Sequence, residues 1–220
     1  MIEATEILRH NNDWITFIFL TILFLLAIAK FLFKEKLLHT GSLILYKRYL
    51  LIYFNKDKSV VFNKFQILLF LIQLLALSVL LFLGNSYLNN GFDSGSEIDF
   101  YFILAGVAAY FGFRYVVGFL LALTFNIKRE YTKIVYDKIS YFGNVILWIL
   151  PLLVLSVYTI EFKELFFAIT MIVFLFLLIV RYALFLLNNK KLIFNNLFYF
   201  ILYLCALEIA PLIIILKSSV

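Results

Sequence analysis

Residues 65–88, FQILLFLIQLLALSVLLFLGNSYL, form a long apolar run without a charged side chain. About 20 apolar residues are enough to cross the hydrocarbon core of a bilayer as a helix. In lipid the backbone must satisfy its own hydrogen bonds, and the alternating polarity of a transmembrane strand is absent from this run. The run therefore predicts a transmembrane helix.

Further runs of the same kind occur along the chain, at residues 14–33, 100–125, 142–160, 165–187 and 197–216. The chain is 65% hydrophobic and only 15% charged, far outside the usage of water-soluble domains. We expect an all-α polytopic membrane protein, one transmembrane domain over 1–220 with a bundle of about six helices. Only Glu161–Glu164 separates the fourth and fifth runs, so five spans remain the alternative.

The first run does not have the features of a signal peptide. Its flank carries Glu3, Glu6 and Asp13 with only Arg9, it is longer than a typical h-region, and no small-residue cleavage pattern follows it. We interpret it as a retained helix.

Positive charge is distributed unevenly between the two sets of loops. Thirteen Lys and Arg residues fall in the loops after the first, third and fifth spans, against three on the opposite side, namely Arg9, Lys163 and Lys217. Because basic loops stay on the cytoplasmic side, both termini are predicted to be non-cytoplasmic. The net charge of +6 is thereby explained by membrane orientation, and no nucleic-acid partner is expected.

The first basic loop, Lys34–Lys64, is long enough to hold structure of its own. It interleaves leucine, isoleucine and tyrosine residues with Lys47 and Arg48. This pattern is typical of an amphipathic segment that lies on anionic lipid headgroups. A role in docking a partner protein is the alternative.

Two opposite charges are predicted at matched depth inside the membrane. Arg114 and Glu208 each lie about 16 Å from the cytoplasmic end of their spans, at 1.5 Å per residue. A charge at that depth is costly and needs a partner, so we expect the two side chains to pair inside the bundle. The pair is interpreted either as a structural clamp or as a polar site for a substrate or proton.

Pro211 lies three residues after Glu208, where it removes a backbone donor and can kink the helix. Kinked helices beside a carboxylate are one way in which transporters build sites at the membrane midplane. Arg114, Glu208 and Pro211 are thus the candidate site residues. Arg181 and Cys205 are secondary candidates, with the Arg181 side chain expected to extend to the headgroups and Cys205 to pack as a small apolar residue.

Small residues four apart suggest a close-packing face in the third span. Ala105 with Ala109, and Ala108 with Gly112, have the spacing that lets membrane helices approach closely. We therefore expect 100–125 to be the central helix.

Several kinds of catalytic site are excluded by missing residues. The only histidines, His10 and His39, are predicted on opposite sides of the membrane, so they do not form one metal or haem site. Neither HExxH, GxSxG nor a nucleotide-binding glycine motif occurs. We expect no cofactor and no enzymatic activity.

Two stretches carry a family resemblance. Residues 195–212, NNLFYFILYLCALEIAPL, and the start of the chain, from Asn12–Thr16 to Ala27–Leu32, resemble an uncharacterised bacteroidetal inner-membrane family of unknown function. The resemblance implies a bacterial inner-membrane location and no particular activity. Glu208 and Pro211 fall inside the quoted C-terminal stretch.

Two functions fit these expectations. The first is a non-enzymatic scaffold or assembly component of a bacterial envelope complex, which binds membrane-protein partners or a second copy of itself. The alternative is a small transporter or channel component that uses Arg114 and Glu208. A dry, packed core favours the scaffold, and a hydrated cavity that reaches Glu208 favours transport.

Overall fold

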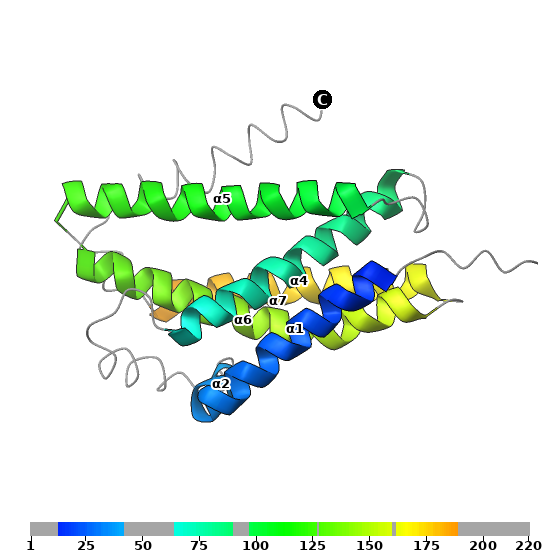
Figure 1. Ribbon diagram of the computed structural model, residues 1–220. Helices are drawn as coiled ribbons and strands as arrows, with labels where there is room; N and C mark the ends of the chain where they lie inside the picture. Colours follow the sequence, from blue (N-terminus) through cyan, green and yellow to red (C-terminus); the bar gives the residue numbers. More distant parts are fainter. Residues whose placement is uncertain (1–12, 42–63, 90–96, 127, 160–161, 189–220) are drawn as a thin grey trace, which may run out of the picture.

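The computed structural model describes residues 13–41, 64–89, 97–126, 128–159 and 162–188. All regular secondary structure in these residues is helical (Figure 1). The helices are α1 (Asp13–Leu32), α2 (Lys34–Gly41), α4 (Lys64–Asn89), α5 (Glu97–Thr124), α6 (Lys128–Tyr158) and α7 (Lys163–Asn188).

Five of these helices, α1, α4, α5, α6 and α7, are long and apolar enough to cross a membrane. The prediction of an all-α membrane-helix protein is confirmed. The number of such helices indicates a multi-pass membrane protein. The fourth and fifth predicted runs are two separate helices, α6 and α7. The predicted span 197–216 lies outside the described residues, so a sixth span stays a prediction.

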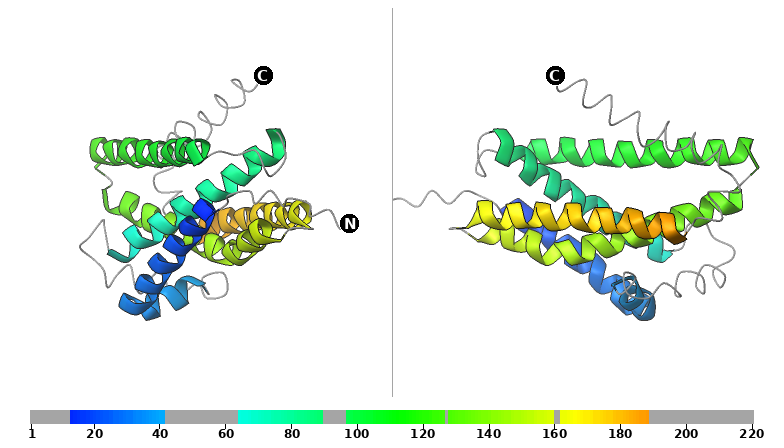
Figure 2. Two further views of the ribbon diagram at one scale, coloured as in Figure 1. Left: turned by 45° about the vertical axis from the view of Figure 1, so that its right-hand side comes forward. Right: turned by 180° about the vertical axis from the view of Figure 1, so that it is seen from behind.

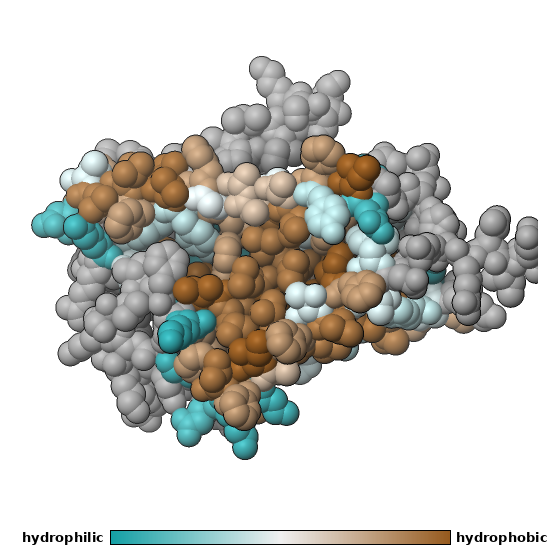
Figure 3. Space-filling model, in the orientation of Figure 1, coloured by the Kyte–Doolittle hydropathy of each residue, from teal (hydrophilic) through white to brown (hydrophobic). Residues whose placement is uncertain are grey.

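Consecutive long helices run in opposite directions. The end of α1, the start of α4, the end of α5, the start of α6 and the end of α7 therefore meet at one end of the molecule, at the left of Figure 1. Lys34, Lys64, Lys128 and Lys133 lie at this end, which we call the basic end. In Figure 3 hydrophilic residues gather there, and a broad hydrophobic surface lies next to them.

Helix α6 begins well before the predicted start at residue 142. Its first three turns mix apolar and polar residues: Tyr131, Ile134, Asp137 and Lys138 are buried, whereas Lys128 is exposed. A hydropathy criterion misses such turns because their polar residues lower the average, although the helical pattern of burial continues. The helix also continues through Pro151 without ending there.

Helix α6 occupies the middle of the bundle. It packs against α2, α4, α5 and α7, while α1 packs against α4 and α2 (Figures 1 and 2). The largest core cluster joins these helices through fully buried side chains such as Ile22, Ile72, Val145 and Leu153. The described core is thus a continuous apolar contact between four of the long helices and part of α5, which contributes Phe100 and Phe111.

The prediction that 100–125 is the central helix is wrong for the described part of the chain. Helix α5 runs along the outside of the bundle (Figure 1), and its only buried residues are Phe100, Val107, Gly118 and Ala122. Small-residue spacing identifies a face that permits close packing, but it does not say which helix packs there.

Much of the remaining apolar surface faces outward. On α7, for example, Ile172 and Ile179 are 67% and 69% exposed. Such exposure would be unfavourable in water but is the expected condition of a helix face that contacts lipid.

Candidate functional site

Two buried amide side chains hold α2, α4 and α6 together near the basic end. Gln73 of α4 is 3% exposed, and its Nε2 donates a hydrogen bond of 2.7 Å to the Ile139 carbonyl oxygen of α6. Asn144 of α6 is 1% exposed, and its Nδ2 donates to the Thr40 carbonyl oxygen of α2. Polar contacts of this kind stabilise membrane helix pairs by about 0.6 kcal/mol each.

The α4/α6 contact depends on a glycine. A Cβ atom at Gly143 would lie 2.5 Å from Leu69 Cδ2 and 2.9 Å from Gln73 Nε2. The absence of that atom lets α4 come close enough for the Gln73 bond to form.

Arg181 of α7 is directed toward α6. Its guanidinium lies 4.6 Å from the centroid of the Phe142 ring, and its NH2 nitrogen donates a 3.2 Å hydrogen bond to the Lys138 carbonyl oxygen. Asp137 and Lys138 of α6 are buried beside this contact. The expectation that the Arg181 side chain simply extends to the headgroups is replaced by an interhelical contact, which offsets the cost of the charge through hydrogen bonding and cation–π attraction.

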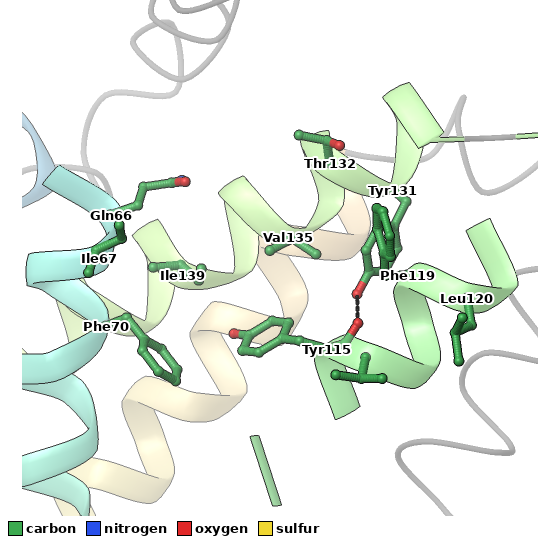
Figure 4. A pocket seen from close by; sticks show the side chains of 11 residues that line it. Gln66, Ile67, Phe70, Tyr115, Phe119, Leu120, Tyr131, Thr132, Val135 and Ile139 are labelled. Atoms are coloured by element: carbon green, nitrogen blue, oxygen red, sulfur yellow. Dashed lines mark hydrogen bonds between the residues drawn. The ribbon is translucent and has the colours of Figure 1, made fainter. Parts of the chain in front are cut away.

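A pocket of about 460 Å³ opens between α4, α5 and α6 at the basic end (Figure 4). We call it the α4/α5/α6 pocket. Most of its walls are aliphatic or aromatic, and the lining residues are Gln66, Ile67, Phe70, Tyr115, Val116, Phe119, Leu120, Tyr131, Thr132, Val135 and Ile139.

A tight turn between α5 and α6 shapes the pocket. Asn126 adopts a left-handed conformation with φ of 56°, which asparagine tolerates better than most residues, and it ends α5 just before Lys128 begins α6. Gly118 leaves room for the Tyr131 ring, since a Cβ there would lie 2.5 Å from the Tyr131 hydroxyl. That hydroxyl donates a 3.0 Å hydrogen bond to the Tyr115 carbonyl oxygen, drawn as the dashed line in Figure 4.

One wall of the pocket carries a buried polar group. The Gln66 side chain extends from α4 alongside α6 (Figure 4) and is 6% exposed. Its Nε2 has no hydrogen-bond partner in the part of the chain that the structure describes. A buried N–H group without a partner costs about 1 to 3 kcal/mol, so this position calls for an acceptor.

Comparison with known proteins assigns the chain to a family. The model of a domain of unknown function, DUF4271, matches residues 15–218, nearly the whole chain. The chain belongs to the DUF4271 family. No curated protein and no solved structure matches it. Membership confirms the predicted resemblance to an uncharacterised family, and the description of DUF4271 assigns no activity.

The described part of this DUF4271 chain contains one of the three candidate site residues. Arg114 is half-buried on α5 and takes part in an interaction. Glu208 and Pro211 lie outside the described residues, as does Cys205, so the pairing of Arg114 with Glu208 stays a prediction. Within the ranges described, no group of three or more His, Cys, Asp or Glu residues has the arrangement of a metal site.

Sequence reasoning missed the buried amides. Gln66 and Gln73 are seven residues apart in an otherwise apolar run, which puts them on the same face of a helix. Polar residues in a membrane span face a neighbouring helix or a cavity, so this spacing was the signal that could have identified the α4/α6 contact.

Proposed function

We propose that this DUF4271 protein is a non-enzymatic scaffold or assembly component of a bacterial envelope complex, embedded in the inner membrane with both termini outside the cytoplasm. The observation that carries the proposal is the exposed small-residue face of α5. The proposal includes no catalytic step, because the sequence holds none of the catalytic motifs considered above.

The α5 face is formed by Ala105, Ala108, Ala109 and Gly112, all of which are exposed. A Cβ atom at Gly106 or Gly112 would meet nothing within 4 Å. In lipid no hydrophobic force drives helices together, so association depends on close backbone approach, which small residues four apart permit. The α5 face therefore has the properties of a docking surface for a transmembrane helix of a partner protein.

The basic end supports the same proposal from the cytoplasmic side. Lys34, Lys36, Lys64 and Lys128 lie at one end of the bundle, where they would attract anionic headgroups and the acidic surface of a partner. The transporter alternative depends on Arg114 and Glu208, and Glu208 lies outside the described residues.

The test is purification of the full chain from native membranes in parallel with two alanine-to-leucine variants. Ala109→Leu adds bulk to the α5 face, and Ala168→Leu adds the same bulk to an exposed position on α7. We expect a partner protein to co-purify in stoichiometric amount with the unaltered chain and with A168L. With A109L the amount of co-purified partner should fall at least tenfold. Equal recovery with both variants would contradict the proposal.

A cysteine experiment separates a partner from the chain's own C-terminal part. The chain has one cysteine, Cys205, so Ala109→Cys creates a single possible intramolecular bridge. We expect oxidation to produce an adduct of higher mass through the introduced thiol even when Cys205 is changed to serine. An intramolecular bridge to Cys205 alone would show that residues near 205 cover the α5 face and would reject the partner site.

A further inference from the structure

We propose that the α4/α5/α6 pocket is a specific binding site for one anionic glycerophospholipid, with an acyl chain inside the pocket and an ester carbonyl accepting a hydrogen bond from Gln66 Nε2. This inference is independent of the scaffold proposal, since it concerns a different surface and a different ligand.

The depth of the pocket fits the glycerol region of a lipid. Its lining comes from the first two turns of α4, the last three turns of α5 and the first three turns of α6, all at the basic end. Lipid ester carbonyls occupy the boundary between the headgroups and the hydrocarbon core, at the ends of transmembrane helices. Gln66, on the first turn of α4, is therefore placed at the level of an ester carbonyl.

The chemistry of the lining favours an acyl chain over water. A volume of about 460 Å³ is within the range of ligand pockets. Water is stable in such a space only when it has two to four polar partners, and most of these walls are apolar. Phe70, Val116 and Leu120 instead offer the aromatic and aliphatic contacts that a hydrocarbon chain makes.

Among the polar groups of the pocket, Gln66 Nε2 is a buried donor that lacks a partner among the described residues. The Tyr131 hydroxyl already donates to the Tyr115 carbonyl oxygen. The Thr132 hydroxyl already donates to the Lys128 carbonyl oxygen, over 2.8 Å. The Gln66 residue is 6% exposed and its Nε2 has no partner among the described residues, so a ligand carbonyl would supply the missing hydrogen bond.

Two lysines near the pocket lining in the sequence of α6 favour an anionic headgroup. Lys128 and Lys133 lie on the first two turns of α6, next to the lining residue Thr132. Lys128 is one helical turn before Thr132 and shares its face of the helix. The N-terminus of α6 adds the positive end of its helix dipole, which favours a phosphate group.

The test is native mass spectrometry of the purified full chain with two lipids that have the same acyl chains, phosphatidylglycerol and phosphatidylcholine. We expect one phosphatidylglycerol molecule to remain bound at collision energies that remove phosphatidylcholine. Equal retention of both lipids would overturn the proposed selection of an anionic headgroup.

Substitutions locate the site. Gln66→Leu keeps much of the side-chain volume but removes the donor, and we expect about fivefold weaker phosphatidylglycerol binding, as loss of one hydrogen bond implies. Val116→Trp fills the pocket from a residue that is 58% exposed, and it should abolish the adduct. Leu175→Trp places the same ring on the outer face of α7 and should leave binding unchanged. Unchanged binding in Q66L and V116W would place the lipid elsewhere and overturn the assignment.

Discussion

Gly143 is a position where one missing methyl group determines how two helices meet. Leu69 and Gln73 of α4 pack directly over it, and the Gln73 amide reaches the Ile139 carbonyl oxygen only because that space is empty. The same logic holds at Gly118, where the Tyr131 ring takes the space of a side chain. Neither glycine is needed for an unusual backbone conformation, since both lie inside helices.

Gly143→Ala is expected to destabilise the purified chain by about 1 to 2 kcal/mol. Overpacking costs about 1 to 3 kcal/mol, and the better helix propensity of alanine returns up to about 1 kcal/mol. Thermal unfolding in detergent measures the change. Gly112→Ala is the matched control, because its methyl group enters open space and should be neutral or slightly stabilising. Equal effects of the two substitutions would refute the proposed close approach of α4 and α6.

At the level of elements, α5 differs from its neighbours. Near its start, Phe100 is buried between Trp14 of α1 and Phe82 of α4, with ring centroids 5.3 Å and 6.0 Å from its own. Near its end, Gly118 lies against the Tyr131 ring of α6, and Ala122 belongs to the same buried cluster as Tyr131. Between these two contacts most of the helix is exposed, which leaves its small-residue face accessible to another helix.

Phe100→Ala is therefore expected to loosen the start of α5. The substitution removes a fully buried ring and its edge contacts, at a cost of about 3 kcal/mol. Hydrogen exchange of residues 97–107 in detergent should become much faster, whereas α7 should change little. Phe102→Ala, on the same helix but 73% exposed, is the control and should behave like the unaltered chain. Equal hydrogen-exchange rates of residues 97–107 in both variants would show that the Phe100 contacts do not hold the start of α5 in place.

At the scale of the whole molecule, the antiparallel arrangement collects the lysines of alternate loops at one end of the bundle. The charge bias of the sequence and the directions of the helices are thus consistent with each other. The predicted orientation, with the basic end in the cytoplasm, follows from this bias because basic loops resist translocation.

Cysteine labelling tests the orientation directly. In a chain with Cys205 changed to serine, Lys128→Cys and Glu164→Cys each introduce one thiol, at opposite ends of the bundle. A membrane-impermeant maleimide added to intact, outer-membrane-permeabilised cells should label the E164C variant and leave the K128C variant unlabelled until the inner membrane is opened. The reverse labelling pattern would show that the basic end lies outside the cytoplasm. It would therefore contradict the predicted orientation and the cytoplasmic position of the pocket.

Some of this architecture was predictable from the residues and some was not. The run at 65–88 predicted a helix that the structure has as Lys64–Asn89, and the start of α6 was missed because its turns mix apolar and polar residues. Arg114 was singled out by depth, and the interhelical contacts of Gln73, Asn144 and Arg181 were not predicted. The depth of a residue along a span can be predicted from the sequence. The neighbouring helix that its side chain faces cannot.

The apolar runs were enough to predict that this chain is helical and crosses a membrane several times, because in hydrocarbon each run must close its own backbone hydrogen bonds. The packing of the helices was needed to show that α6 is central and α5 peripheral among the described helices, and that Gln66 lines a pocket while Gln73 joins two helices. Lipid tails and protein interiors are equally apolar, so hydrophobicity along a span does not distinguish a face that contacts lipid from one that contacts another helix.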